Sequence, residues 1–413
     1  MLLNIVLFCG LLSSCKESDT PTPKGTDPIE TKAAFELVWS KAASASFTCY
    51  EILLSNQVAI FSKQDEGNGF IDALVALDLK TGDTLWVWDE QVKLTKEHLL
   101  VNNILYFTGQ TTALVYAVNV TTGKTMWTYG ANTALTSAIN GLGYGNNKLF
   151  VSFNYGWKET LNDSTLLFSI DPLSGIGTHE FTLYTKKRGG YRQTPSTPVY
   201  WKHPNGNDML FLQGGGWNWD KNVNQGRGEY YVIDLLADTI YFDLGNFFSH
   251  PAIGADPLLL GSNIIISNGW DKNASINLLT GKTNWTTTIS DNEATSGGYI
   301  LSGGDRLYFS AGNEGFLNIL NGANGQLVFS NKKVGKSSLY GSKLIQYKNH
   351  LYFTTADGLI KTDMEGKIVV KVTVEDTIGG YNGSFTSGLA IDPKTGYMYS
   401  TRGNRFMCFK EKL

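Results

Sequence analysis

This chain has few charged residues, and it lacks the residue patterns that mark most catalytic sites. Charged residues make up only 17% of its 413 residues, with 34 Lys and Arg against 37 Asp and Glu. No basic stripe is present, which argues against nucleic acid as a partner. The five histidines lack metal-ligand spacing, and there is no Gly-x-Ser-x-Gly elbow or phosphate-binding glycine loop.

Long helical patterns are also missing, whereas glycine and aromatic residues are plentiful. After the N-terminal region, no long segment repeats its apolar residues every 3.6 positions. The 45 glycines and the 12% of aromatic residues are typical of many short strands joined by tight turns. The sequence therefore predicts an all-β protein.

A short motif recurs along the chain and predicts its architecture. Segments 76–86, 117–127 and 275–285 share an Asp or Asn, a Thr-Gly turn and a Trp four residues after the glycine. Weaker copies keep the frame, with turn positions at 82, 123, 175, 238, 281, 325 and 366. The spacing is about 42 residues, as in the four-stranded blades of β-propellers. Glycine supplies the positive φ that the Thr-Gly turns need, and the Trp is expected to lie flat between blades.

Segments near the two ends of the chain are predicted to form one blade together. A further unit, from Phe385 to Lys410, contains three strands and lacks an outer one. The segment from Phe35 to Ser40 has the missing pattern, and its Trp39 has the same context as the motif tryptophans. We therefore expect the N-terminal strand to complete the C-terminal blade and close a ring of eight blades, with seven as the alternative count.

These repeats resemble the quinoprotein-type (PQQ-like) propeller, whose motif reads Ala-x-Asp-x-x-Thr-Gly-Lys-x-x-Trp. The resemblance covers the chain from about Phe35 to Leu413 and implies a fold like that of quinoprotein alcohol dehydrogenases. Two families share the repeat: PQQ-dependent dehydrogenases, and non-enzymatic propellers such as the lipoprotein of the outer-membrane barrel-assembly machine. The alcohol-oxidising members have adjacent cysteines and a calcium ligand set, and this chain has no Cys-Cys pair. We therefore expect no enzyme activity and neither PQQ nor calcium as a cofactor.

The N-terminus predicts export and lipidation. Residues 2–12 are apolar but too few to span a bilayer, and the following Leu-Ser-Ser-Cys resembles a lipobox. We expect residues 1–14 to be a lipoprotein signal peptide, Cys15 to carry lipid, residues 15–30 to be a polar tether, and residues 31–413 to be the propeller. The acidic cluster after Cys15 resembles the surface-export signal of Bacteroidetes lipoproteins. It favours the cell-surface side of the outer membrane over the periplasmic side.

Two cysteines remain in the propeller, Cys49 and Cys408. A disulfide between them would fit an oxidising compartment. Two unrelated buried thiols are the alternative that we favour.

Three consecutive units have tryptophans in the hairpin between their second and third strands. Those hairpins open on the same face as the blade-to-blade connections, here called the loop face, whereas the Thr-Gly turns lie on the opposite turn face. The blade-to-blade links before and after the middle unit, residues 186–192 and 246–250, are expected to add cations and aromatic rings on the loop face and to complete a candidate ligand or partner site. Its predicted members are Trp157, Arg188, Tyr191, Arg192, Trp217, Trp219, Asp220, Lys221, His250, Trp270, Asp271 and Lys272.

The alternative interpretation is that these tryptophans only cover apolar surface at the blade edges. Asp220 begins an alternating oxygen pattern like a calcium loop, but Gln225 replaces the glycine that such a loop needs. The sequence therefore predicts a lipid-anchored, non-catalytic platform that binds an envelope protein. A glycan-binding surface lipoprotein is the second hypothesis, and a PQQ-dependent dehydrogenase is a distant third.

Overall fold

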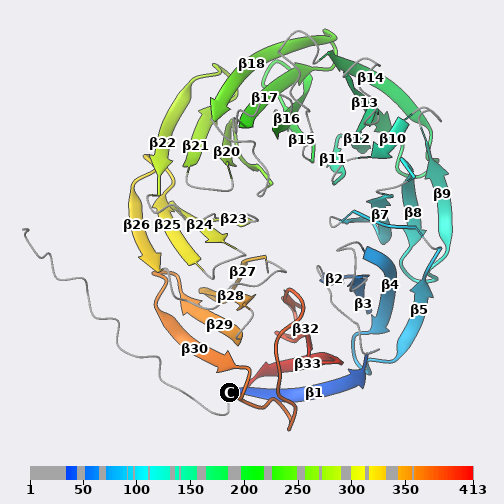
Figure 1. Ribbon diagram of the computed structural model, residues 1–413, viewed down its shortest axis with the longest axis vertical. Coiled ribbons are helices and arrows are strands. Elements are labelled where there is room, and N and C mark those ends of the chain that lie inside the picture. Colours follow the sequence, from blue (N-terminus) through cyan, green and yellow to red (C-terminus); the bar gives the residue numbers. More distant parts are fainter. Residues whose placement is uncertain are drawn as a thin grey trace, which may run out of the picture.

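The computed structural model is a ring of β-sheets around a central axis (Figure 1). It describes residues 34–43, 52–64, 71–90, 92–95, 98–109, 112–130, 135–138, 141–155, 164–184, 197–217, 226–248, 256–268, 272–289, 299–311, 316–331, 343–355 and 358–412. Within these residues the strands form eight antiparallel sheets and there is no helix. The predicted all-β, eight-bladed propeller is confirmed, and the seven-blade alternative is wrong.

The first four blades follow the chain order. Blade 1 contains β2 (Ile52–Leu54), β3 (Val58–Gln64), β4 (Ile71–Asp78) and β5 (Thr84–Trp88). Blade 2 contains β6 (Leu99–Val101), β7 (Ile104–Thr108), β8 (Val115–Asn119) and β9 (Thr125–Tyr129). Blade 3 contains β10 (Leu135–Ala138), β11 (Gly143–Gly145), β12 (Lys148–Tyr155), β13 (Ser164–Ile170) and β14 (Gly177–Tyr184). Blade 4 contains β15 (Val199–Lys202), β16 (Asp208–Trp217), β17 (Gly226–Asp234) and β18 (Thr239–Phe248).

The remaining blades continue in the same way until the last one. Blade 5 contains β19 (Leu258–Leu260), β20 (Asn263–Ser267), β21 (Lys272–Asn277) and β22 (Thr283–Thr288). Blade 6 contains β23 (Tyr299–Gly303), β24 (Arg306–Ala311), β25 (Phe316–Asn321) and β26 (Leu327–Asn331). Blade 7 contains β27 (Ile345–Tyr347), β28 (His350–Thr355), β29 (Gly358–Asp363) and β30 (Ile368–Thr373). Blade 8 contains β31 (Ala390–Ile391), β32 (Met398–Arg402), β33 (Arg405–Glu411) and β1 (Phe35–Ala42).

Blade 8 joins both ends of the chain, as the sequence predicted. Strand β1 pairs with β33 in antiparallel register from Phe35 opposite Glu411 to Ala42 opposite Arg405. The backbone N–H of Lys412 also donates to the carbonyl oxygen of Ala34 at 2.9 Å. Pairing the first described strand with the last removes the open edge that each would otherwise present.

The recurring motif is a turn in one blade onto which an aromatic ring of the preceding blade packs. In blade 1 the Asp78 carboxylate accepts the N–H groups of Lys80 and Thr81 at 2.8 and 2.9 Å. Gly82 has φ +72°, and a Cβ there would lie 2.5 Å from the indole of Trp39. The same relation joins Trp86 to Gly123, Trp127 to Gly175, Phe242 to Gly281, Trp285 to Gly325 and Phe329 to Gly366. The tryptophans therefore lie between neighbouring blades, as predicted, and hold them together.

The core is divided among the interfaces between blades. The buried apolar side chains form eight clusters within the described residues, one at each interface around the ring. The cluster at the closure contains Trp39 and Cys408 from blade 8 and Phe61 from blade 1. Each blade alone would expose both of its apolar faces, so the ring must be complete for all of them to be buried.

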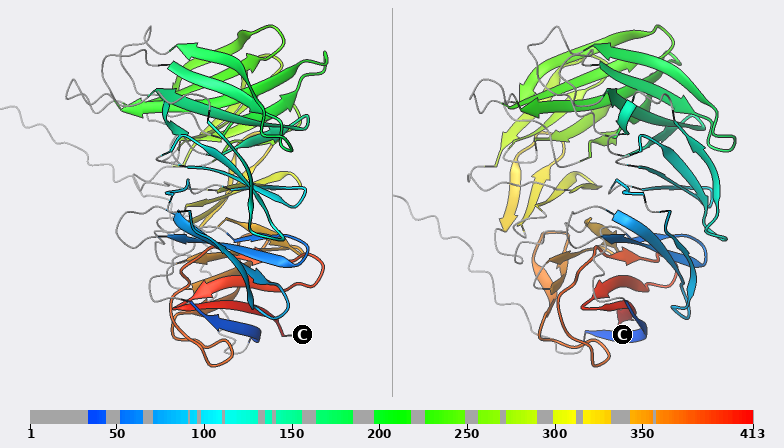
Figure 2. Two further views of the ribbon diagram at one scale, coloured as in Figure 1. Left: turned by 90° about the vertical axis from the view of Figure 1, so that its right-hand side faces the viewer. Right: turned by 45° about the vertical axis from the view of Figure 1, so that its right-hand side comes forward.

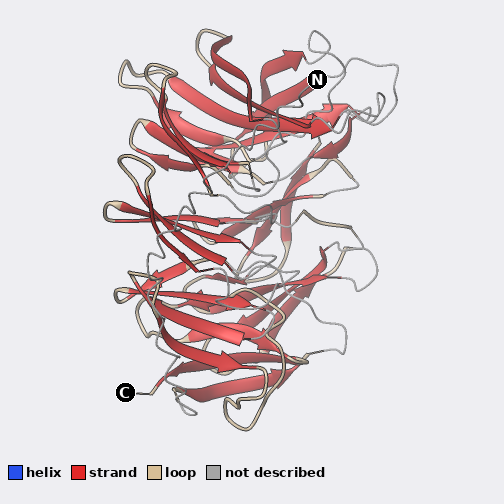
Figure 3. Cartoon of the chain, turned by 60° about the vertical axis from the view of Figure 1, so that its left-hand side comes forward, coloured by secondary structure: helices blue, strands red, loops and turns tan. Residues whose placement is uncertain are grey.

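The turns and the C-terminus share one face of the ring, the turn face (Figure 2, Figure 3). The third-to-fourth-strand turns of blades 1–7 lie there, and the third strand of blade 8 ends there beside Ala34. Among the described residues, no helix is both long enough and apolar enough to cross a bilayer.

Cys408 is a free thiol and is fully buried in β33. Burial raises its pKa to about 12. Cys49 and Cys15 lie outside the described residues.

Candidate functional site

The predicted loop-face site falls almost entirely outside the described residues. Of its members, the structure describes Lys272, the first residue of β21, and the backbone of Trp217, the last residue of β16. The others lie outside: Trp157, Arg188, Tyr191, Arg192, Trp219, Asp220, Lys221, His250, Trp270 and Asp271. The site therefore stays a prediction.

The strands that flank the site are described, and they bring its three hairpins to neighbouring blades. Segments 156–163, 218–225 and 269–271 each join the second and third long strands of blades 3, 4 and 5. In blade 4 these strands are the longest of the three pairs, and their register extends to Trp217 opposite Gly226. Trp217 thus ends a strand rather than lying in a loop, so the backbone beneath it belongs to the sheet.

One segment of the predicted site region is placed differently from expectation. Residues 246–250 were expected to link blades 4 and 5 and to present aromatic rings on the loop face. Asn246, Phe247 and Phe248 instead continue strand β18, and Phe248 is 2% exposed in the cluster between these blades. The sequence expectation was wrong here because Phe248 is needed to fill the interface between the two blades.

Unsatisfied polar atoms are buried in the same three blades. Ser152 Oγ in blade 3, Tyr230 Oη in blade 4 and Asn273 Oδ1 in blade 5 have no hydrogen-bond partner. Tyr230 is surrounded by the rings of Phe211, Phe247 and Phe248, and burial raises its pKa well above the ordinary value. Elsewhere in the described residues, Thr362 Oγ1 and Arg402 Nη1 are also unsatisfied. Such atoms are costly to bury, and they occur in blades 7 and 8 as well as in this sector.

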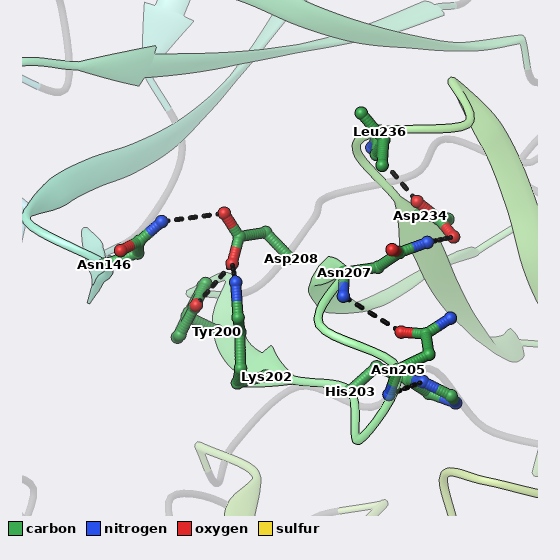
Figure 4. A network of polar contacts seen from close by, with 9 residues as sticks. All are labelled: Asn146, Tyr200, Lys202, His203, Asn205, Asn207, Asp208, Asp234 and Leu236. Carbon is green, nitrogen blue, oxygen red and sulfur yellow. Dashed lines mark hydrogen bonds and ion pairs between the residues drawn. The ribbon is translucent and has the colours of Figure 1, made fainter.

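A polar cluster with well-placed side chains lies on the turn face, where blades 3 and 4 meet (Figure 4). Its centre is Asp208, the first residue of β16. The carboxylate accepts hydrogen bonds from Tyr200 Oη at 2.6 Å, Lys202 Nζ at 2.6 Å and Asn146 Nδ2 at 2.8 Å. Asn146 comes from the hairpin between β11 and β12, so the cluster ties blade 3 to blade 4.

A second carboxylate, that of Asp234, connects the turn that joins β17 to β18 with the turn that joins β15 to β16. Asn207 Nδ2 donates to Asp234 Oδ2 at 2.7 Å, and the N–H groups of Leu236 and Ala237 donate to Asp234 Oδ1 at 3.0 Å. In the turn that joins β15 to β16, the N–H of Asn205 donates to His203 Nδ1 at 3.1 Å. This bond leaves the proton of a neutral His203 on Nε2.

The contacts of Asp208 with Tyr200, Lys202 and Asn146, called the Asp208 clamp below, change the pKa values of the groups that take part. Burial acts to raise the pKa of Asp208, but the hydrogen bonds from Lys202, Tyr200 and Asn146 lower it below the ordinary value. Burial and the bond to Asp208 raise the pKa of Tyr200. Lys202, Tyr200 and Asn146 all donate to the one carboxylate of Asp208, which makes the cluster a connection between blades 3 and 4. The sequence patterns did not predict this cluster, although a tight turn between two strands is indicated by Pro204, Asn205 and Gly206.

A metal site in a protein needs several ligand side chains close together. Among the described residues, no group of three or more His, Cys, Asp or Glu side chains could hold a metal ion. The expectation of neither calcium nor PQQ stays a prediction, and we derive no step through PQQ.

Comparison with known proteins confirms the resemblance to PQQ-like propellers. The sequence model of the family described as "Outer membrane protein assembly factor BamB" matches residues 36–216, which is blades 1–3 and part of blade 4 with β1. The match covers less than half of the chain. No curated protein matches the sequence significantly.

Solved structures show the same fold over nearly the whole chain. BamB from Moraxella catarrhalis is 12% identical with a TM-score of 0.58, covering 92% of this chain and 98% of that one. The quinohemoprotein alcohol dehydrogenase from Comamonas testosteroni is 10% identical with a TM-score of 0.66, covering 91% and 76%. The computationally designed protein Ika8 is 12% identical with a TM-score of 0.62, covering 91% and 99%. An assembly factor, an enzyme and a designed protein thus share this ring, so the fold alone does not fix a function.

Proposed function

We propose that this chain is a non-catalytic propeller of the cell envelope, anchored by lipid on Cys15, that holds a protein partner on the loop face of blades 3–5. The observation that carries the proposal is the family match over residues 36–216, because that family is described as an outer-membrane assembly factor. A lipobox at the N-terminus and a polar tether suit a protein that works at an outer membrane.

The place of the partner site is supported by how this sector differs from the rest of the ring. Repeats that only build the ring need short hairpins, such as the β7–β8 hairpin of blade 2. In blade 4 the β16–β17 ladder instead runs nine residue pairs, from Met209 opposite Asp234 to Trp217 opposite Gly226. A long ladder of paired strands is a suitable support for aromatic anchors, which dominate binding energy at protein interfaces.

Catalysis is not part of this proposal. The alcohol-oxidising relatives resemble one another in an adjacent cysteine pair against the cofactor, and this sequence has none. The dehydrogenase neighbours share about a tenth of their residues with this chain, which supports the fold and not the reaction.

The test is a pull-down from detergent-solubilised envelope with the lipidated full-length chain. Wild type is compared with Trp217→Ala/Trp270→Ala and with Lys80→Ala, an exposed turn-face substitution in blade 1 that serves as the control. We expect a defined protein partner with wild type and the control, and its loss with the double variant. Equal recovery by all three chains would place the partner site elsewhere on the ring.

The same preparation decides the glycan-binding alternative. Trp217 and Trp270 could each stack on a sugar ring, with Asp220 and Asp271 accepting hydroxyl hydrogen bonds. Retention of wild type on envelope polysaccharide, lost in the double variant and without a protein partner, would favour that function. Dye reduction with added PQQ and calcium would contradict the non-catalytic proposal.

A further inference from the structure

The turn face has an arc of exposed apolar side chains that the blade architecture does not require. In each of blades 1–7, one turn residue lies two positions after the Asp or Asn that caps the turn. This tip residue is Lys80 in blade 1, Thr121 in blade 2, Ala323 in blade 6 and Glu365 in blade 7. In the three consecutive blades 3, 4 and 5 it is Leu173, Leu236 and Leu279.

These leucines project into solvent. Leu173 is 70% exposed and Leu236 is 79% exposed, and Ile176 beside Leu173 is 71% exposed. Leu279 is less exposed, at 37%. Exposed apolar side chains are ordinary when they are scattered, but a run of them on neighbouring hairpins marks a binding surface.

The turn conformation does not explain the leucines. Asp171 accepts the N–H groups of Leu173 and Ser174, as Asp78 accepts those of Lys80 and Thr81. The turn is therefore built by the capping carboxylate and the backbone, and a lysine serves equally well at its tip. The leucine side chains contribute nothing to this hydrogen bonding.

The arrangement of the tips fits a flat surface. They stand at the ends of separate hairpins, and those hairpins reach the same face of the ring (Figure 3). The capping carboxylates of Asp171 and Asp234 are turned back into their own turns by these hydrogen bonds. Apolar side chains at separate hairpin tips on one face can each insert into a flat apolar surface, which needs no matching cleft.

The chain that precedes the propeller also reaches this face. Ala34 hydrogen-bonds to Lys412 at the turn-face end of blade 8, and residues 16–33 lie between Ala34 and the predicted lipidated Cys15. Blade 8 is opposite blade 4 in the ring (Figure 1). At about 3.3–3.6 Å per extended residue, such a tether allows the turn face to touch the membrane that holds the lipid. Anchoring by lipid raises the local concentration of the tips at that membrane, so that weak insertion suffices.

We infer that the tips of blades 3–5, Leu173, Ile176, Leu236 and Leu279, insert into the surface of the phospholipid bilayer to which Cys15 is anchored. This inference rests on the proposed lipid anchor. It directs the turn face to the membrane and the loop face, with its predicted partner site, away from it. It thus assigns an orientation to a platform that a tether alone would leave free to rotate.

The test uses the lipidated full-length chain on vesicles of phosphatidylethanolamine and phosphatidylglycerol. A nitroxide is attached to Leu236→Cys in a Cys49→Ala background, and Thr121→Cys is the matched control on a polar tip. We expect the label at position 236 to be reached by oxygen and shielded from a water-soluble nickel chelate, and the control label to show the reverse. Adding Leu173→Asp/Leu279→Asp should reduce the shielding at position 236 roughly tenfold.

Other outcomes overturn the inference. Equal access of the nickel chelate to both labels means that the arc stays in water. Shielding only in native envelope membranes, and not in the protein-free vesicles, means that a protein covers the arc. Shielding that depends on the amount of chain per vesicle means that a second copy does. Flotation with the vesicles reports the lipid anchor separately, and loss of flotation refutes the anchor on which this inference rests. The pull-down reports the partner site independently of both.

Discussion

The indole of Trp39 lies directly on the backbone of Gly82, the turn glycine of the neighbouring blade, and its Nε1 donates to the carbonyl oxygen of Leu79 at 2.9 Å. Trp39 belongs to the first strand of the chain, yet it occupies the position that Trp86 and Trp285 occupy at other interfaces. The closure therefore uses the same contact as the rest of the ring.

The first prediction separates the two reasons for a glycine at position 82. Gly82 and Gly304 both have positive φ, but a Cβ at Gly82 would overlap the Trp39 ring, whereas one at Gly304 meets nothing within 4 Å. Gly304→Ala should cost about 1–2 kcal/mol from backbone strain alone. Gly82→Ala should cost about 1–3 kcal/mol more, because the indole must move. Urea unfolding of both variants measures this, and equal losses would show that the ring contact is not tight.

The second prediction concerns Arg402, which holds the connection between blades 7 and 8. It is 1% exposed, and its guanidinium donates to the carbonyl oxygens of Gly383, Thr373 and Asp376 at 2.9, 2.7 and 2.6 Å. Arg402→Met removes all three bonds, and of the three carbonyl oxygens that of Thr373 keeps a second donor, the N–H of Asp376 at 3.3 Å. We expect a loss of about 3 kcal/mol in the free energy of unfolding and faster amide exchange at Gly383.

Arg306 provides the matched control for this prediction. It also donates to a carbonyl oxygen, that of Met364 at 3.1 Å, but its side chain is 29% exposed. Water can replace its bonds, so Arg306→Met should cost less than Arg402→Met. An equal cost for both would show that burial does not determine the contribution of Arg402.

The third prediction follows from the Asp208 clamp. Its pKa is lowered in the folded chain, so it stabilises the fold above the unfolded pKa of about 3.9, and this stabilisation is lost as the pH falls through the folded value. Asp208→Asn should therefore cost about 1 kcal/mol at neutral pH, since the group is partly exposed, and almost nothing in strong acid. Chemical unfolding over a pH series gives this difference directly.

A double-variant cycle checks the partner of that carboxylate. Lys202→Met should cost less in the Asp208→Asn chain than in the wild type, because the two groups lie 2.6 Å apart. Additive losses would mean that the ion pair contributes nothing and that the Tyr200 and Asn146 hydrogen bonds carry the clamp.

The fourth prediction uses Cys408 as a reporter of ring opening. The thiol is fully buried and its pKa is raised to about 12, so it is almost entirely protonated at pH 8. Iodoacetamide should modify it slowly in native buffer and rapidly in urea, as followed by mass spectrometry of the peptide that contains it. Rapid modification in native buffer would show that β33 separates from its neighbours without global unfolding.

The sequence predicted the parts of this fold that repeat. The turn motif located blades 1–7, because its capping residue, its glycine and its aromatic residue interact at fixed offsets at six of the eight interfaces. The same motif in residues 35–40 predicted the closure, and the pairing of β1 with β33 confirms it.

Features that occur once were not predictable in the same way. Phe248 extends β18 because of the neighbouring blade, and Asp208 meets Asn146 only because two blades place their hairpins side by side. Contacts of this kind depend on the curvature of the ring, which no local pattern records. The leucine tips are visible in the sequence, but their common face and exposure come from the structure.

The pairing of β1 with β33 also sets an order of events during synthesis. Strand β1 is made before any blade, and its hydrogen-bonding partner is made last, after all the others. Until then β1 has an unpaired edge and the first and last blades have an uncovered apolar face. A chain of this design therefore keeps an unpaired strand edge until its synthesis is almost complete, and such edges favour pairing with other chains and aggregation.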